Sequence, residues 1–174
     1  MNYYDEIATG YEELHRQEQE TKIEIIKKHI KIKPTDKLLD VGCGTGLTTI
    51  PWDCKLYGLD PSKKLLEKAK LKSQNKTKNI TWVNATAEKI PFKDNYFDIV
   101  ISVTAIQNFD NLEKGLDEIK RVGKNRFVLT FLKASLRNKE ISDAIENKFN
   151  IKKSLQKENF LKIEEEKDLI YICN

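Results

Sequence analysis

The sequence predicts a single α/β domain in which helices cover both faces of a mostly parallel β-sheet. Short apolar runs typical of buried strands alternate with segments of helical periodicity, and this alternation is characteristic of parallel sheets. A glycine-rich turn directly follows the first apolar run. The 174 residues fit one domain, and no repeat or low-complexity linker divides them. We expect residues 1–174 to form this domain, with a helical cap at 1–33 and the core at 34–174.

The first half of the chain is expected to form three helices and three strands. Apolar side chains between residues 11 and 32 recur at near-helical spacing before Pro34. Glycines then open a short helix after the first strand, and Pro61 takes the first position of the next helix. The elements after Pro34 are, in order, a strand at 37–42, a helix at 47–52, a strand at 54–60, a helix at 61–73 and a strand at 79–85.

The second half of the chain continues this alternation and ends in a less regular segment. The pattern at 138–149 is helical. Two short segments at 159–166 and 168–174 are expected to close the sheet as an antiparallel hairpin. The elements before residue 138 are a strand at 96–103, a helix at 111–122 and a strand at 126–132.

The glycine-rich turn predicts a nucleotide-like ligand. In a doubly wound, Rossmann-like sheet the loop after the first strand lies at the carboxyl ends of the strands, where ligands bind. Gly42, Gly44 and Gly46 permit positive φ there and allow a ligand to lie against the peptide groups. Asp60 follows eighteen residues after Gly42, at the end of the second strand, where a carboxylate can accept both hydrogen bonds of a ribose diol.

The spacing of the glycines separates two cofactor classes. Dinucleotide-binding loops favour G-x-G-x-x-G, whereas this chain has G-x-G-x-G, with Leu47 in place of the third glycine of that motif. Asp40 precedes the glycines, where its negative charge repels a pyrophosphate and attracts an ammonium group. S-adenosylmethionine carries an ammonium group, so the sequence favours it over a dinucleotide.

The chain resembles the class I S-adenosylmethionine-dependent methyltransferases, in particular the type 11 methyltransferase domain. The resemblance covers residues 37–132 and rests on LLDVGCGTG, LYGLDPSKKLLEKA, ATAEKIPFKDNYFDIVIS and LEKGLDEIKRV, in the family's order. It implies S-adenosylmethionine as cofactor, with Asp40 and the glycine loop on its methionine part and Asp60 on its ribose. The cofactor-binding residues implied in this way are Asp40, Gly42, Cys43, Gly44, Gly46, Asp60, Pro61, Thr86, Ala87 and Tyr11.

Several of these residues also have purely structural explanations. Asp40 can cap the turn, and Asp60 can be the N-cap of the next helix while it also binds the ribose. The family usually has an acidic residue for the adenine amine after the third strand. Thr86 stands at that position, and its hydroxyl accepts a weaker hydrogen bond than a carboxylate, while Ala87 would present its backbone to the ring. Tyr11 resembles the tyrosine of a helix that covers the cofactor, and core packing explains it equally well.

The acceptor side of the predicted site lies in TAIQNFDN, the loop after the fourth strand. In the family this loop faces the transferred methyl group, and many relatives carry a histidine pair at the positions of Gln107 and Asn108. We expect these two side chains to contact the substrate, with a solvated loop as the alternative. Methyl transfer from a sulfonium can proceed by positioning alone, and the sequence identifies no catalytic base.

More than one function is compatible with these residues. The family fold takes most of the chain and leaves no insertion for a substrate lid, which favours a macromolecular acceptor, such as tRNA or a translation-related protein, and a partner subunit. The alternatives are a small-molecule methyltransferase, a catalytically silent S-adenosylmethionine-binding subunit and, against the glycine spacing, a dinucleotide-binding oxidoreductase. Direct nucleic-acid binding stays open, because the lysines of residues 62–78 could bind phosphate, although a solvated lysine face is the favoured explanation.

The strand predicted at 79–85 is the candidate site for a partner. In the strand order of the family it lies at an edge of the sheet, where unpaired backbone groups invite another chain. Its Ile80, Trp82 and Val83 are apolar. Some relatives that act on tRNA or translation factors pair this edge with a small zinc-binding activator. An edge protected by its own helix or by a homodimer contact is the alternative.

The composition predicts a cytoplasmic protein without a metal site or membrane segment. Residues 1–14 mix acids and tyrosines and lack the basic and then apolar order of a secretory signal. No apolar run approaches the roughly 18 residues of a membrane span. The cysteines, Cys43, Cys54 and Cys173, and the two histidines are too scattered for a disulfide framework or a zinc site.

Overall fold

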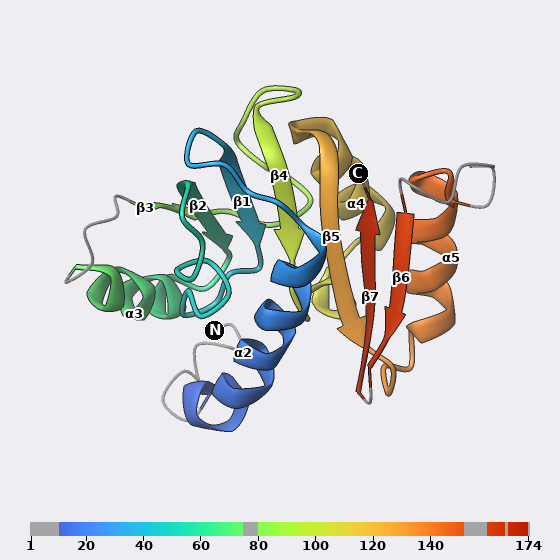
Figure 1. The fold of residues 1–174 in the computed structure, drawn as a ribbon, viewed down its shortest axis with the longest axis horizontal. Coiled ribbons are helices and arrows are strands. Elements are labelled where there is room, and N and C mark those ends of the chain that lie inside the picture. The colour runs from blue at the N-terminus through green and yellow to red at the C-terminus, as the bar shows by residue number, and fades with distance from the viewer. Residues whose placement is uncertain (1–10, 75–79, 152–159, 166, 174) are drawn as a thin grey trace.

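The fold is seen in a computed structural model that describes residues 11–74, 80–151, 160–165 and 167–173 (Figure 1). Within these residues no helix has both the length and the apolar character needed to cross a bilayer. The elements in chain order are α2 (Tyr11–His29), β1 (Lys37–Val41), β2 (Lys55–Asp60), α3 (Lys63–Ser73), β3 (Ile80–Asn84), β4 (Phe97–Ser102), the 3-10 turn η1 (Ile106–Asn108), α4 (Leu112–Val122), β5 (Gly123–Leu132), α5 (Asn138–Lys148), β6 (Phe160–Glu164) and β7 (Asp168–Cys173).

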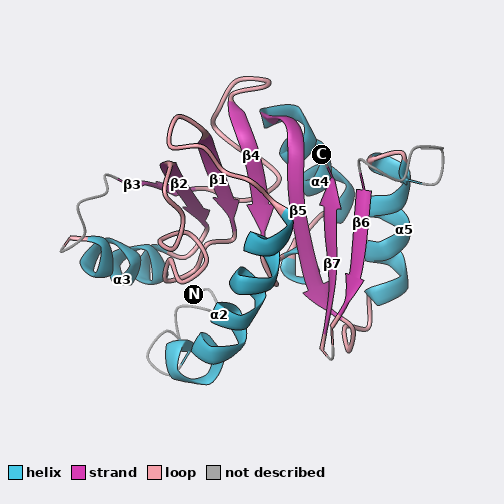
Figure 2. Ribbon diagram, viewed as in Figure 1, coloured by secondary structure: helices cyan, strands magenta, loops and turns pink. Residues whose placement is uncertain are grey.

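The strands form one seven-stranded sheet in the order β3-β2-β1-β4-β5-β7-β6. The first five strands of this order are parallel, whereas β7 pairs antiparallel with both β5 and β6 (Figure 2). The predicted fold class, a doubly wound sheet with an antiparallel C-terminal hairpin, is confirmed. The strand order reverses between β1 and β4, so the loops after these two strands diverge at the carboxyl edge of the sheet. Such a switch point is where open α/β sheets bind ligands.

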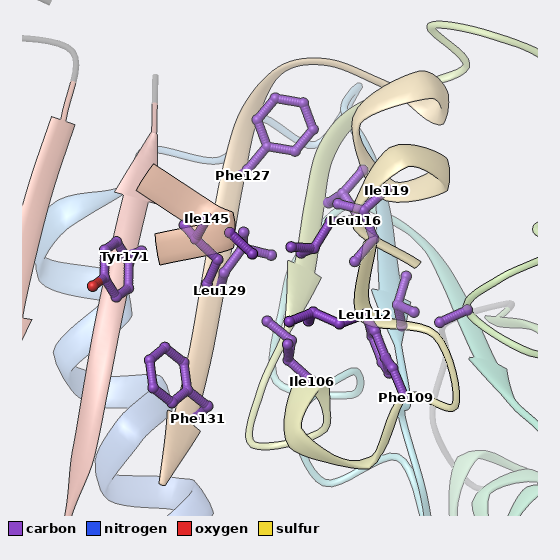
Figure 3. Close-up of a cluster of buried hydrophobic side chains, with 14 of the residues drawn as sticks. Ile106, Phe109, Leu112, Leu116, Ile119, Phe127, Leu129, Phe131, Ile145 and Tyr171 are labelled. Atoms are coloured by element: carbon purple, nitrogen blue, oxygen red, sulfur yellow. The ribbon is translucent and has the colours of Figure 1, made fainter. Parts of the chain in front are cut away.

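Helices cover both faces of the sheet, as predicted. On one face the apolar side of α2 contributes Ile23, Ile26 and Ile30 to a buried cluster with β1, β2, β4, β5 and β7. On the other face α4 and α5 pack against β4, β5 and β7, and Figure 3 shows Leu116 of α4 and Ile145 of α5 in the same buried cluster. The central strands β1 and β4 are buried on both faces and position the loops at their carboxyl ends.

The helix predicted at 47–52 is wrong, because the segment from 44 to 51 forms a series of turns. The hydroxyls of Thr48 and Thr49 donate hydrogen bonds to the Asp40 carboxylate, at 2.6 and 2.7 Å. The Thr48 carbonyl accepts a hydrogen bond from the indole N–H of Trp52 at 2.8 Å. Such side-chain hydrogen bonds compete with the helical backbone pattern, and Pro51 has no N–H to donate to it. The segment is therefore held by a buried carboxylate instead of a helix.

Helix α3 begins at Lys63 with Ser62 as its N-cap. The Ser62 hydroxyl accepts a hydrogen bond from the Leu65 N–H at 3.2 Å, which satisfies one donor of the first turn. Pro61 thus precedes the cap and does not take the first helical position, and the N-cap role considered for Asp60 is also wrong. Asp60 instead accepts a hydrogen bond from the Ser62 N–H at 2.8 Å and shapes the turn before the cap.

Candidate functional site

A cavity of about 350 Å³ lies at the carboxyl edge of the sheet, where the loops after β1, β2, β3 and β4 meet. Its charged lining residues are all acidic, which makes it attractive to a cationic ligand. The lining residues are Gly42, Gly44, Leu59, Asp60, Pro61, Leu65, Thr86, Ala87, Glu88, Thr104, Ala105, Asn108, Phe109 and Asp110.

The loop after β1 has the backbone conformation that its glycines predict. Gly42, Gly44 and Gly46 have φ angles of 78°, 52° and 81°, a region that side chains disfavour. A Cβ on Gly42 would lie 2.4 Å from the Cβ of Ala105, and one on Gly46 would lie 2.7 Å from Cη2 of Trp82. At these two positions the protein's own packing excludes a side chain, whereas the sequence suggested only the approach of a ligand.

Asp60 joins the glycine loop to the turn before α3. One of its carboxylate oxygens accepts the Gly44 N–H at 2.9 Å, and the other accepts the Ser62 N–H. The residue is only 6% exposed, yet it lines the cavity. Because a carboxylate oxygen can accept more than one hydrogen bond and Asp60 lines the cavity, this residue is placed to contact a ligand there.

Asp40 is completely buried at the end of β1 and does not line the cavity itself. One carboxylate oxygen accepts the hydroxyls of Thr48 and Thr49, so the residue does hold the turn. Its other oxygen, Oδ1, has no hydrogen-bond partner among the described residues. Burial raises the pKa of Asp40 from 3.8 to about 6, although the two threonine hydroxyls lower it. Asp40 is thus a desolvated carboxyl group with one free acceptor atom behind the glycine loop.

The predicted cofactor residues divide between the cavity wall and the layer behind it. Cys43 and Gly46 do not line the cavity, and burial raises the pKa of the Cys43 thiol, which keeps it protonated. The Tyr11 side chain lies outside the described residues. Those that line the cavity are Gly42, Gly44, Asp60, Pro61, Thr86 and Ala87.

The two predicted substrate residues have different positions. Asn108 is exposed and lines the cavity. Gln107 does not line it, because its side-chain amide folds back and donates to the Thr104 carbonyl at 2.8 Å. The sequence reasoning did not assign Glu88 or Phe109 to the site. Glu88 follows the predicted adenine residues directly, so its charge was a usable signal, whereas Phe109 reaches the wall through the η1 turn, which no periodicity indicates.

Comparison with known proteins identifies the same kind of domain. Residues 39–131 match the family model described as a methyltransferase domain. An uncharacterized protein of Methanocaldococcus jannaschii is 39% identical over 136 residues, which are 77% of this chain and 51% of that protein. A 2-phytyl-1,4-naphtoquinone methyltransferase of Trichormus variabilis is 32% identical over 137 residues, 70% of this chain and 58% of that enzyme. The chain thus spans about half the length of the curated relatives it matches.

A solved structure shares the fold over nearly the whole chain. A methyltransferase of Haloferax volcanii, in a complex with the Trm112 methyltransferase activator, superposes with a TM-score of 0.76. The match covers 99% of this chain and 97% of the other, at 14% identity. At that identity the likeness supports the fold alone.

Proposed function

We propose that this chain, which belongs to the methyltransferase domain family, binds S-adenosylmethionine in the carboxyl-edge cavity and transfers its methyl group to an acceptor. S-adenosylmethionine is the cofactor of the family, as predicted. When bound, it supplies a methyl group already activated on a positively charged sulfur. The chain's own residues then have to bind, orient and exclude water.

The charge of the cavity carries this proposal. Asp60, Glu88 and Asp110 line it, and no lysine or arginine stands among its lining residues in the described part of the chain. S-adenosylmethionine bears a sulfonium and an ammonium against one carboxylate, so its net charge suits an acidic wall. A dinucleotide would bring a pyrophosphate next to these carboxylates, which argues against the oxidoreductase alternative.

The buried layer supports the same ligand. The free Oδ1 of Asp40 is the candidate acceptor for the ammonium group, and Asp60 is the candidate for the ribose hydroxyls. Thr86 and Ala87 are the candidates for contacts with the adenine. Tyr11 is proposed to cover the cofactor, on the resemblance alone. Asn108 is the substrate-side candidate at the wall.

Calorimetry with S-adenosylmethionine, S-adenosylhomocysteine and NAD tests the proposal. We expect the first two to bind and NAD not to bind. Asp60→Ala should weaken the binding of S-adenosylmethionine by about 1.5 to 3 kcal/mol, the range for hydrogen bonds to a charged group. Asp94→Ala, which removes an exposed carboxylate outside the cavity, is the control and should leave the affinity unchanged. Tight binding of NAD, or equal affinities of Asp60→Ala and wild type, would contradict the assignment.

We further propose a macromolecular acceptor, tRNA or a translation-related protein, presented with the help of a small zinc-binding activator on the edge strand predicted at 79–85. Strand β3 is at an edge of the sheet, as expected, and the Haloferax volcanii neighbour is bound to an activator. The naphtoquinone methyltransferase relative favours the small-molecule alternative. Trp82 of this edge strand is already engaged within the chain, because its indole N–H donates to the Ser73 hydroxyl and its ring packs against Gly58.

Co-purification from the native source tests the partner. We expect a small zinc protein to accompany the chain and Thr81→Lys to release it, because a charge on an edge strand discourages pairing. Thr81 is the better position for this change since it is exposed, whereas Val83 packs against the core. A chain that purifies alone and binds S-adenosylmethionine equally well with and without the change would contradict the partner.

A further inference from the structure

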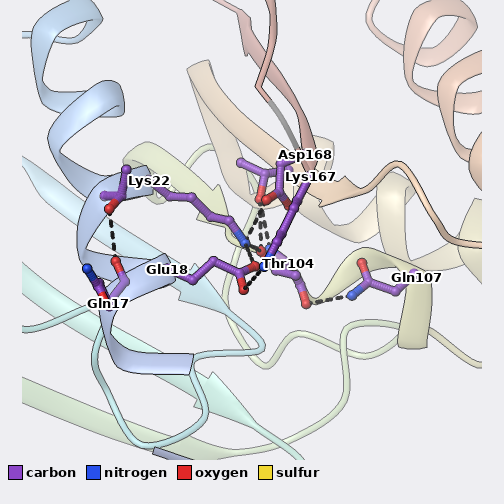
Figure 4. A network of polar contacts seen from close by, with 9 residues as sticks. Gln17, Glu18, Lys22, Thr104, Gln107, Lys167 and Asp168 are labelled. Atoms are coloured by element: carbon purple, nitrogen blue, oxygen red, sulfur yellow. Dashed lines mark hydrogen bonds and ion pairs between the residues drawn. The ribbon is translucent and has the colours of Figure 1, made fainter. Parts of the chain in front are cut away.

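A buried polar cluster links α2, the loop after β4 and β7 (Figure 4), and one of its members, Thr104, lines the cavity. Lys22 of α2 is only 3% exposed, although lysine is almost never buried without partners. Its ammonium group contacts Glu18 Oε1 at 2.7 Å, Thr104 Oγ1 at 2.8 Å and Asp168 Oδ2 at 2.9 Å. Asp168 is 2% exposed, and its Oδ1 has no partner among the described residues. We call Lys22, Thr104 and Asp168 the Lys22 cluster.

The Lys22 cluster joins three segments that are distant in sequence. Lys22 lies on α2, Thr104 lies in the loop after β4, and Asp168 is the first residue of β7. Because β7 is antiparallel, Asp168 pairs with Leu132 at the carboxyl end of β5. The cluster therefore stands at the same edge of the sheet as the cavity.

Thr104 is the member of the cluster that reaches the cavity. It lines the wall with a φ of 55°, an unusual conformation for a β-branched residue. The Thr104 N–H donates to Thr130 Oγ1 at 2.8 Å, and its carbonyl accepts the Gln107 side chain. Strained backbone of this kind persists only where the surroundings determine it, and it gathers at functional sites.

The next residue transmits the position of Thr104 to the glycine loop. The Cβ of Ala105 would be 2.4 Å from a Cβ on Gly42, so the two loops touch without a gap. A displacement of Thr104 therefore moves the wall that faces the glycine loop. The proposed function assigns this loop to the methionine part of the cofactor.

The buried ion pair is a poor explanation for stability alone. Apolar side chains of similar volume usually stabilise a core at least as well, because two charges lose their hydration on burial. The pKa of Asp168 shows this loss, since burial raises it in spite of the hydrogen bond and charge of Lys22. Fixing one geometry is the better-attested role for such a pair.

We propose that Lys22 and Asp168 are positioning residues that hold Thr104 and Ala105 in the shape that receives the amino-acid part of S-adenosylmethionine. The inference rests on the proposed function and adds to it a contribution from α2 and β7. Disrupting the cluster should lower the affinity for ligands that carry the amino-acid part and leave unchanged the affinity for ligands that end at the thioether.

The variant Lys22→Met/Asp168→Asn tests the proposal, because it removes both buried charges together. Glu18 also loses its contact with Lys22, but its side chain is partly exposed and lies 3.9 Å from the Lys167 ammonium group. We expect its affinity for S-adenosylmethionine to fall about tenfold, which is within the range for substitutions that act on a site through packed neighbouring residues. Its affinity for 5′-methylthioadenosine, which lacks the amino-acid part, should stay within about twofold of wild type. The control Asp36→Asn/Arg126→Met removes a 3.0 Å ion pair near the amino ends of the strands and should change neither affinity.

The outcomes are distinguishable. Selective loss of S-adenosylmethionine supports the positioning role. Equal loss of both ligands would indicate a general loss of structure, and no loss of either would make the pair a packing feature, so both results would overturn the inference. A wild-type protein that binds neither ligand would contradict the proposed function itself.

Discussion

Gly42→Val should abolish cofactor binding and destabilise the fold by about 3 kcal/mol or more, the sum of a left-handed backbone and an overpacked contact. The new Cβ would lie 2.4 Å from the Cβ of Ala105. The backbone cannot shift to relieve this contact, because the Gly42 N–H donates to the Leu59 carbonyl at 2.8 Å and Cys43 donates to the same oxygen. The substitution therefore strains two of the loops that form the cavity, those after β1 and β4.

Urea unfolding and calorimetry measure this effect, with Asn95→Val as the matched control. Asn95 also has a positive φ, 54°, but it is exposed in a surface turn and so isolates the backbone strain. The control should be destabilised by about 1 to 2 kcal/mol and should bind S-adenosylmethionine normally. If Gly42→Val unfolds and binds like this control, the contact with Ala105 does not limit the loop.

The fold could be predicted from the sequence because its signals are local. Each strand of the core is a short apolar run, and α4 has its apolar side chains on one face, so the order and type of these elements follow from periodicity. The helix predicted at 47–52 failed for a non-local reason. Thr48 and Thr49 donate their hydroxyls to a carboxylate on the preceding strand, and no helical pattern reveals such a bond.

The site could be predicted only as far as its motifs reach. The glycine loop and Asp60 could be predicted because they lie at the carboxyl ends of two adjacent parallel strands, which the apolar runs identify. The excluded side chain at Gly42 depends on Ala105, and the Lys22 cluster joins Lys22 to Asp168, residues that lie far apart in the chain. Long-range packing of this kind leaves no periodic signal. Gln107 illustrates the converse, since its position in the motif suggested substrate contact although its amide bonds to its own loop.

Asp40→Asn should stabilise the protein at pH 8 by about 3 kcal/mol while it weakens cofactor binding. The pKa of Asp40 rises from 3.8 to about 6 on folding, chiefly through burial. A carboxyl group whose pKa is raised on folding stabilises the folded state only while it is protonated, and it loses this contribution as the pH rises from about 4 to 6. The full loss is about 3 kcal/mol, at 1.36 kcal/mol for each unit of pKa. Asparagine is neutral like the protonated carboxyl group, so the variant does not lose this stability as the pH rises.

The pH dependence distinguishes this explanation from a general effect of the substitution. The advantage of Asp40→Asn in urea unfolding should be full at pH 8, shrink through pH 6 and vanish near pH 4. The control Asp98→Asn should show the opposite sign at pH 8. Burial raises the pKa of Asp98, but hydrogen bonds from Lys124 and the Lys37 N–H lower it overall, so its charged form stabilises the fold.

The affinity for S-adenosylmethionine should also depend on the protonation state of Asp40. If the ammonium of S-adenosylmethionine binds at Asp40 Oδ1, wild-type affinity should be constant above about pH 7 and fall by up to tenfold per pH unit below about pH 6, as the carboxyl becomes neutral. Asp40→Asn should bind weakly over the whole range and lose this dependence. 5′-Methylthioadenosine, which has no ammonium group, is the control and should bind independently of pH through this interval. A wild-type affinity for S-adenosylmethionine that does not change between pH 5 and 8 would remove Asp40 from the ammonium site.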